Sequence, residues 1–489
     1  MKLSRPALAL AAALIIAASS LSLVHSTPAD EPLAVTPLDD GTQHPAPEPD
    51  PKAAADFGAE AEKPAAQEDA VEGGAELDPA AELPKPGAGA DQVDDDVKRE
   101  SETTPNHADQ TPVLAKMTEL TKAPKKVSGG GKDDQWWFKT TKQKRNEKEW
   151  VKGAEPIVEA WNVYSESMGR DIPVAIIPAR DENGNPITGA PTLYMLNGAG
   201  GAEQNADWIT SGDADIFFEN KGVNVVIPME GAFSYYVDWL EDGEHLKQNS
   251  SYFKGPQKWT TFLGRELRPA VEDHLEANGK RAVVGMSMSA TSSLLLAEHY
   301  PGEFDAVGSF SGCAATSTPI PWAFAGLTVN RAASNGGRIT PAHAWGPMGS
   351  PYNRYNDALV NADKLEGSKL YISNASGLGA NEDMFGYRTE VRGQKSADAL
   401  SGSATTIVEG GVIEGATNAC THDFRAKLNG LGIEAHYEFK NAGTHSWPVW
   451  EDDMRRSWNT VIGPTLIGEG FKPDESLQES NSWNANGSS

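Results

Sequence analysis

The sequence predicts an α/β fold with a mostly parallel central sheet, helices on both faces of the sheet, and a helical or loop insertion after the sixth strand. Continuous apolar strand segments alternate with helical segments along the chain, a pattern typical of parallel sheets covered on both faces. One of these strands, at Val283-Val284, turns sharply at Ser287 into an apolar-periodic helix. The last predicted strand leads directly into the loop that carries His445.

The individual strands are predicted from apolar, β-branched and aromatic runs bounded by turn residues, and the helices from apolar periodicity. The predicted strands are 158–164, 167–177, 192–196, 222–228, 280–285, 304–312, 369–373 and 435–439. The predicted helices are 213–218, 267–275, 291–300 and 424–431. Segment 319–345 has no clean strand signal and is assigned to the insertion. Trp136-Trp137-Phe138, among lysines, predicts a helical lead-in within 132–152 whose aromatic side chains pack on the domain.

Ser287 stands in the pattern Gly285-x-Ser287-x-Ser289, inside a predicted strand, turn and helix. This is the context of a nucleophile elbow, in which a strained turn exposes the serine Oγ, and it identifies the α/β fold as the α/β-hydrolase fold. Free N–H groups and the positive dipole at the start of the following helix suit a developing oxyanion, so the N–H of Met288 is a predicted oxyanion donor. The alternative interpretation is a helix start at which Ser287 and Ser289 act only as capping hydroxyls.

A loop of small residues, 197–201, follows the buried strand 192–196. In an α/β-hydrolase sheet the loop after the third strand supplies the second oxyanion donor. The N–H of Ala199 is the candidate for that donor. The alternative is a flexible glycine-rich turn without a ligand.

A serine nucleophile needs a base, and the base needs an acceptor that fixes its tautomer. In this fold the acid and then the histidine follow the serine along the chain, with the histidine on a loop after the last strand. After Ser287, only His445 directly follows a strand end. The other histidines lie in predicted helices, in the insertion or within a strand: His299, His343, His422 and His436. The acid stays open among five carboxylates: Asp383, Glu390, Asp398, Glu409 and Glu414.

The two ends of the chain are predicted to lie outside the folded domain. Residues 1–26 combine Lys2 and Arg5 with a short apolar run, which is typical of a secretory signal peptide. Residues 27–130 are assigned to a disordered acidic segment rich in Pro and Ala, residues 131–468 to the α/β-hydrolase domain, and 469–489 to a disordered tail.

Between Thr27 and Asp109 there are 22 acidic and five basic residues, so the net charge of −27 says little about the partner of the folded domain. Basic residues form only short runs, so no nucleic-acid partner is expected.

The chain has two cysteines, Cys313 and Cys420. An even pair in an exported protein favours a disulfide, although their separation along the chain does not establish their distance in space. No metal and no cofactor is expected.

Seven segments resemble the mycolyltransferases of the antigen 85 type, particularly their corynebacterial members, in order over about residues 155–465. The segments are 167–172, 196–198, 236–239, 258–263, 285–288, 345–347 and 443–447. The resemblance implies a secreted α/β-hydrolase fold with a Ser, Glu, His triad at Ser287, Glu414 and His445, and Ile413-Glu414-Gly415 looks like the family's acid position. It also implies oxyanion donation by Met288 and by the position of Ala199.

The resemblance implies transfer of a mycolyl or corynomycolyl group from trehalose monomycolate through an acyl-enzyme on Ser287. The expected acceptors are trehalose monomycolate, arabinogalactan or an envelope protein, with the enzyme a monomer in peripheral contact with the outer mycolate layer. Asn197, Gly200 and Trp447 are the expected substrate-binding residues, although many members carry Asp and Arg where this chain has Asn197 and Gly200. The rival interpretations are a secreted carboxylesterase and a non-catalytic envelope-binding member of the same fold. The segment 381–413 looks longer than in mycobacterial members and has no predicted role.

Overall fold

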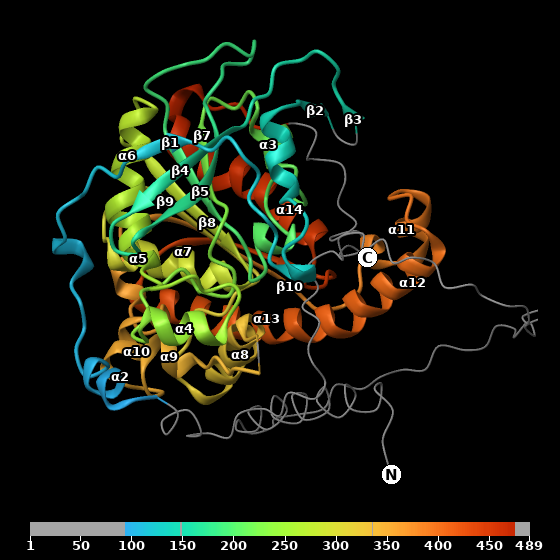
Figure 1. Cartoon of the computed structure of the whole chain (residues 1–489). Coiled ribbons are helices and arrows are strands. Elements are labelled where there is room, and N and C mark those ends of the chain that lie inside the picture. The colour runs from blue at the N-terminus through green and yellow to red at the C-terminus, as the bar shows by residue number, and fades with distance from the viewer. Residues whose placement is uncertain (1–92, 147–148, 335, 475–489) are drawn as a thin grey trace, which may run out of the picture. The chain divides into compact units, whose positions relative to one another are not determined.

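The computed structural model of this chain describes residues 93–474, apart from 147–148 and 335. A nine-stranded sheet forms its centre, in the order β1-β4-β5-β7-β6-β8-β9-β10-β11 (Figure 1). The six strands from β7 to β11 in that order run parallel, and β1, β4 and β5 pair antiparallel at one edge. The α/β-hydrolase fold class predicted from the sequence is therefore confirmed.

Eight of the nine strands of the main sheet agree with the predicted apolar runs to within a few residues, and β1 was not predicted. The nine strands are β1 (Met117–Glu119), β4 (Glu159–Ser165), β5 (Arg170–Ile177), β6 (Thr192–Leu196), β7 (Asn224–Pro228), β8 (Arg281–Met286), β9 (Ala306–Phe310), β10 (Lys369–Ala375) and β11 (Ala435–Lys440). A separate hairpin is formed by β2 (Arg145–Asn146) and β3 (Glu149–Trp150).

The helices lie on both faces of the sheet and in the insertions. Those before the insertion are α2 (Asp95–Glu100), α3 (Ala214–Phe218), α4 (Gly243–Asn249), α5 (Trp259–Thr261), α6 (Arg268–His274) and α7 (Met288–His299). Those that follow are α8 (Pro319–Val329), α9 (Pro341–Trp345), α10 (Pro351–Tyr355), α11 (Phe385–Glu390), α12 (Ser396–Thr405), α13 (Gly411–Leu431), α14 (Trp447–Ser457) and α15 (Gly463–Ile467). Helices α8 to α10 follow β9, the sixth predicted strand, so the insertion lies where the sequence placed it. None of the helices in the described part of the chain is long and apolar enough to cross a membrane.

Each face of the sheet carries its own apolar core because successive strand residues point to opposite faces. On one face Val283 and Val307 pack with Leu294 and Leu295 of α7. On the other face, a second cluster joins strand residues to side chains of α3 and α14, among them Phe218 and Met454. Burial on both faces explains why these strands read as continuous apolar runs.

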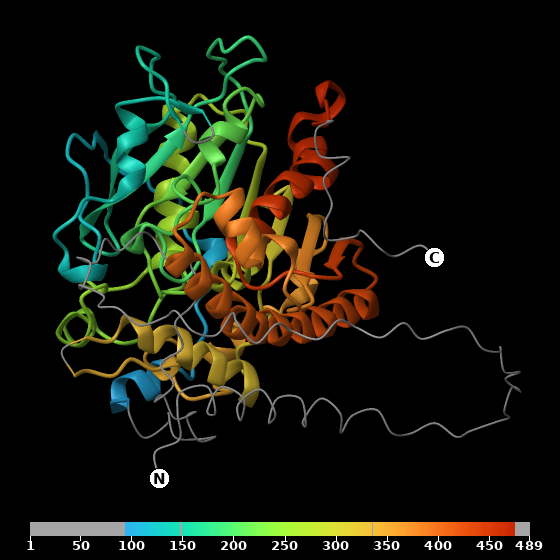
Figure 2. The ribbon, with the colours of Figure 1, turned by 90° about the vertical axis from the view of Figure 1, so that its right-hand side faces the viewer.

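Residues 93–130 belong to the fold, so the prediction that the disordered segment extends to residue 130 is wrong. Helix α2 buries Val97, the His107 imidazole is buried against Tyr355 and Asp238, and β1 pairs with β4 along the sheet edge. In Figures 1 and 2 α2 lies beside the insertion helices, where Tyr352 donates its N–H to the carbonyl of Ser101. Residues 93–130 contain few apolar residues, and individual buried side chains such as Val97 and His107 hold this polar segment on the domain. The predicted signal peptide, most of the acidic segment and the end of the C-terminal tail lie outside the described residues.

Two helical predictions also need correction. The lead-in at 132–152 is a short 3-10 helix, η4 (Trp136–Thr141), followed by the β2–β3 hairpin; Trp137 and Phe138 are buried, but Trp136 is exposed. The last helix before β11 begins at Gly411, so Glu414 lies in its first turn. It continues directly from α12 through η10 (Thr406–Gly410), a π-helical segment. The extra residues in 381–413 therefore fold into helices (Figure 2).

Candidate active site

Ser287 stands at the sharp corner between β8 and α7. Its backbone has φ 55° and ψ −121°, a conformation that costs free energy in a non-glycine residue and is typical of functional turns. Close approach of strand and helix requires Gly285, because a Cβ added there would lie 2.0 Å from the carbonyl oxygen of Ser289. The hydroxyl of Ser289 lies 2.8 Å from the Leu196 carbonyl, which ties the elbow to the end of β6. Nucleophile elbows usually carry glycine at the position of Ser289. In this chain the Ser289 side chain therefore stabilises the turn through its hydrogen bond.

A chain of two hydrogen bonds joins Ser287, His445 and Glu414. Ser287 Oγ lies 2.7 Å from His445 Nε2, and His445 Nδ1 lies 2.8 Å from Glu414 Oε2. Ser287 is partly exposed, whereas His445 and Glu414 are buried. The arrangement can activate the serine hydroxyl, because the carboxylate fixes the imidazole tautomer in which Nε2 is free to accept a proton.

The carboxylate of Glu414 is held by donors that the sequence did not single out. Its Oε1 accepts from Ser311 Oγ at 2.8 Å, Asn374 Nδ2 at 2.9 Å and the N–H of Ala375 at 2.7 Å. These residues come from the carboxyl ends of β9 and β10, where small and polar residues end an apolar strand. In the sequence, the change from apolar to small and polar residues at these strand ends could have indicated the donors to Glu414. Of the five candidate acids, Glu414 is therefore the one whose carboxylate is placed to orient His445.

The His445 loop is fixed from two sides. Asp383, one of the candidate acids, accepts from Thr444 Oγ1 at 2.8 Å and from Ser446 Oγ at 3.3 Å. The Trp450 ring packs edge-on against the imidazole of His445, with the ring centroids 5.0 Å apart. Neither partner could be found from periodicity, because both contacts depend on how α14 and the segment 376–410 fold back on the loop.

The two predicted oxyanion donors lie on adjacent segments. Met288 is the first residue of α7, so the helix provides no acceptor for its N–H. The loop after β6 touches the elbow, since a Cβ added at Gly198 would lie 3.8 Å from the carbonyl oxygen of Met286. Ala199 is partly exposed and accepts from the N–H of Phe233. Donation by Met288 and Ala199 stays a prediction.

A buried carboxylate anchors the loop that carries Ala199. Glu203 Oε2 accepts from the N–H groups of Gly231 at 3.1 Å and Ala232 at 2.8 Å. Burial raises the pKa of Glu203 to about 7, an effect that nearby Lys254 partly offsets. The loop is thereby tied to the segment after β7.

Two of the three expected substrate-binding residues have other roles. Asn197 is buried; its Nδ2 donates to the Pro228 carbonyl at 2.9 Å, and its Oδ1 accepts from the N–H of Trp208 at 3.0 Å. Trp447 is 2% exposed and packs between Trp208 and Trp450 in the core. Both therefore support the site from within the protein, and the expectation that they contact substrate is wrong. Gly200 is partly exposed, and its substrate contact stays a prediction.

Cys313 and Cys420 form a disulfide in the structure. It joins the segment after β9 to α13, the helix that carries Glu414. The cross-link therefore connects the two elements that supply the acid and its Ser311 donor.

One group of side chains has the composition of a metal site: Glu241, His245 and His343. His343 Nδ1, however, accepts from the N–H of Thr340 at 2.9 Å. In a neutral ring the other nitrogen then carries the proton, so His343 as placed has no free lone pair for a metal. Its role is to cap α9.

Comparison with known proteins places the chain in a family. Residues 165–459 match the family of putative esterases. The Ag85A diacylglycerol acyltransferase/mycolyltransferase of Mycobacterium leprae is 29% identical over 314 residues, which cover 63% of this chain and 84% of that protein. Ag85C of the same species is 28% identical over 302 residues, covering 61% and 79%. Among solved structures, Mycobacterium tuberculosis MPT51 (FbpC1) aligns with a TM-score of 0.43 and 23% identity, over 62% of this chain and 96% of that one.

The family match spans residues 165–459, from the end of β4 through α14, and together with the Ag85 relatives it confirms the resemblance that the sequence segments indicate. The chain belongs to the putative esterase family, and its sequence is similar to the acyltransferases of the Ag85 type.

Proposed function

We propose that this protein is a secreted acyltransferase that moves a mycolyl or corynomycolyl group from trehalose monomycolate to an acceptor hydroxyl through an acyl-enzyme on Ser287. The observation that carries the proposal is the hydrogen-bonded chain from Ser287 Oγ through His445 to Glu414. Similarity to the Ag85 proteins, which are named as mycolyltransferases, supports the choice of acyl group.

In the first half-reaction, His445 Nε2 takes the proton of Ser287 Oγ as Oγ attacks the ester carbonyl of the donor. The N–H groups of Met288 and Ala199 stabilise the oxyanion, a contribution of about 3 kcal/mol for each donor. His445 then gives the proton to the departing trehalose oxygen. In the second half-reaction an acceptor hydroxyl loses its proton to His445 and attacks the acyl carbonyl, and Ser287 recovers its proton. Glu414 keeps the imidazole in the required tautomer throughout.

An apolar surface beside His445 supports a long-chain donor. Seven large apolar side chains between residues 378 and 408 are exposed, out of 14 in the described part of the chain: Leu378, Met384, Phe385, Val391, Leu400, Ile407 and Val408. We call this set the α11–α12 surface. It adjoins the site, because the His445 N–H donates to the Gly410 carbonyl and the Gly443 N–H to the Leu378 carbonyl. Exposed apolar clusters of this kind are typical of contact with lipids or partners.

Three classes of acyl acceptor are compatible with the site. Trehalose monomycolate, arabinogalactan or an envelope protein each offers a hydroxyl, and the buried position of Asn197 leaves Gly200 as the remaining predicted contact. Secretion through residues 1–26, a monomeric state and peripheral contact with the outer mycolate layer complete the proposal.

The decisive experiment offers radiolabelled trehalose monomycolate to the purified enzyme, with and without trehalose and an envelope protein, and identifies the products by mass spectrometry. We expect label on an acceptor and a covalent acyl adduct on Ser287, both lost in Ser287→Ala. Release of free mycolic acid alone, at the same rate with every acceptor, would instead establish a carboxylesterase. No reaction with the donor, and no labelling of Ser287 by a phosphonate probe, would establish a non-catalytic protein.

A further inference from the structure

Within the described residues, the largely exposed tryptophans lie at one place outside the active site. Twelve of the 13 tryptophans lie among the described residues, and nine of the twelve are buried. Only Trp136 and Trp150 in this part of the chain are largely exposed, at 44% and 40%. Both line the same pocket. Leaving two indoles in water opposes the hydrophobic effect, so their joint placement points to a ligand.

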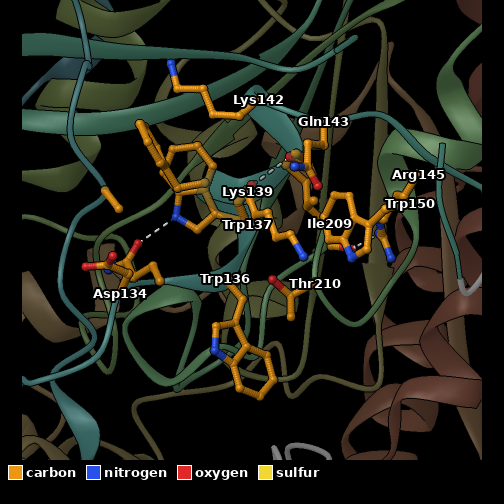
Figure 3. Close-up of a pocket in the computed structure, with 14 residues that line it drawn as sticks. Asp134, Trp136, Trp137, Lys139, Lys142, Gln143, Arg145, Trp150, Ile209 and Thr210 are labelled. Carbon is orange, nitrogen blue, oxygen red and sulfur yellow. Dashed lines mark hydrogen bonds between the residues drawn. The ribbon is translucent and has the colours of Figure 1, made fainter. Parts of the chain in front are cut away.

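The pocket has a volume of about 660 Å³ and lies between η4 and the β2–β3 hairpin, with Ile209 and Thr210 from the main domain also lining it. Figure 3 shows the Lys139 ammonium and the Thr210 side chain between the indoles of Trp136 and Trp150. The volume falls in the range of small-molecule sites. None of the residues that line the pocket belongs to the proposed catalytic set.

The polar groups of the pocket are of two kinds. Arg145 is committed to the protein, since it forms ion pairs with Asp213 at 2.7 Å and Asp215 at 2.6 Å. Lys139 has no carboxylate partner among the residues that the structure describes, and its Nζ lies 3.9 Å from the centroid of the Trp150 ring. The side-chain amide of Gln143 also has no hydrogen-bond partner within the described residues. Lys139 and Gln143 can therefore donate to a ligand.

We infer that this pocket binds a sugar unit of a neutral, hydroxyl-rich polysaccharide. The C–H face of a sugar ring is apolar and matches the face of an indole, while its equatorial hydroxyls match ammonium and amide donors at the ring edge. A cationic ligand is opposed by Lys139 and Lys142, which also line the pocket. A lipid chain would leave the polar groups of Lys139, Gln143 and Thr210 unsatisfied. The site would hold the enzyme on a glycan while Ser287 reacts, and it does not depend on the proposed acyl group.

The test measures binding of soluble arabinogalactan and of dextran to the full-length secreted protein by isothermal titration calorimetry. We expect the wild type to bind at least one of these polysaccharides, with an affinity that added salt does not change. Trp136→Ala and Trp150→Ala should each weaken binding by about tenfold, the loss expected for one aromatic stacking contact. The backbone N–H of Trp136, which donates to Asn205 Oδ1, is retained in Trp136→Ala, and equal melting temperatures would verify folding.

The matched control is Tyr164→Ala, because Tyr164 is also an aromatic residue with 44% exposure but does not line the pocket. It should bind as the wild type does. Binding should also survive a phosphonate that blocks Ser287, which separates the pocket from the active site. Failure of the wild type to bind either polysaccharide would overturn the inference, as would unchanged affinity in both tryptophan variants. Binding of phosphatidylglycerol vesicles or inorganic phosphate in place of the polysaccharides, weakened by salt and by Lys139→Gln, would also overturn it.

Discussion

Thr444 Oγ1 donates a hydrogen bond to Asp383 Oδ1 at 2.8 Å, so the residue next to His445 is held by the segment between β10 and α13. Asp383 is itself fixed, because its Oδ2 accepts from the N–H of Ala380 at 2.9 Å. This segment, for which the sequence suggested no role, positions the base.

Asp383→Ala should therefore lower kcat by about tenfold to a hundredfold, since a displacement of the base by as little as 1 Å can have an effect of that size. KM for a short-chain ester should change little, because Asp383 is buried and is not in contact with solvent or a bound ester. Steady-state kinetics and a melting curve check this, with Asp398→Ala on α12 as the control. Equal kcat values in the two variants would contradict a positioning role.

Glu414→Gln is expected to lower kcat by about ten-thousand-fold without unfolding the protein. Three donors surround Oε1, so a glutamine must place its amide oxygen there and turn its NH₂ group towards His445 Nδ1. Nδ1 then becomes an acceptor, and Nε2 carries the proton and cannot deprotonate Ser287. Single-turnover kinetics measure the effect, and Glu390→Gln, an exposed glutamate on α11, is the control. A loss of less than tenfold would show that Glu414 does not set the tautomer.

The sheet and the elbow could be predicted from the sequence because each depends on local pattern: apolar runs for the strands, and Gly285 followed by Ser287 for the turn. The position of His445 after the last strand also follows from chain order. Glu414 could not be chosen from periodicity among five carboxylates, because its selection depends on the tertiary contact of α13 with β9 and β10. The resemblance, rather than residue pattern, identified it. The resemblance implies substrate contact for Asn197 and Trp447, and their burial could not be predicted because it depends on tertiary packing rather than on neighbours in the sequence.

The α11–α12 surface predicts a dependence on acyl chain length. Leu378→Asp should lower kcat/KM for a long-chain ester by about tenfold, since a charge would replace an apolar contact of 1.5–3 kcal/mol (an order-of-magnitude figure for burial of such a side chain). Turnover of a butyrate ester should be retained. Leu114→Asp is a matched control, because Leu114 and Leu378 are 65% and 67% exposed. A parallel loss for long and short esters in Leu378→Asp would mean that the substitution damages the site itself.

The Cys313–Cys420 disulfide closes a loop of 107 residues. In the chain-entropy account a cross-link of this span stabilises the folded state by about 5 kcal/mol, so the double variant Cys313→Ser, Cys420→Ser should lose about that much free energy of unfolding. Urea unfolding measures it, with the wild type under reducing conditions as a comparison. A loss of under about 1 kcal/mol would indicate that the reduced chain retains the same constraint by packing.

Asp207 predicts a pH dependence of stability. Its side chain is fully buried, Oδ1 accepts from the N–H groups of Ile209 and Thr210, and burial raises the pKa from 3.8 to about 6. Between these two pH values the folded protein holds a proton that the unfolded chain has released. The contribution of Asp207 to stability is therefore present below pH 3.8 and is lost as the pH rises to about 6, by about 3 kcal/mol at most.

Asp207→Asn should remove this part of the pH dependence, because the amide stays neutral while its oxygen keeps the two N–H donors. The free energy of unfolding, measured by urea titration on both sides of the window, should fall less steeply with rising pH in the variant than in the wild type. Comparing slopes cancels the contributions of all other titrating groups, including Glu203. Parallel curves for the two proteins would mean that Asp207 ionises in the fold as it does in water, because its two backbone donors stabilise the buried carboxylate as much as burial destabilises it.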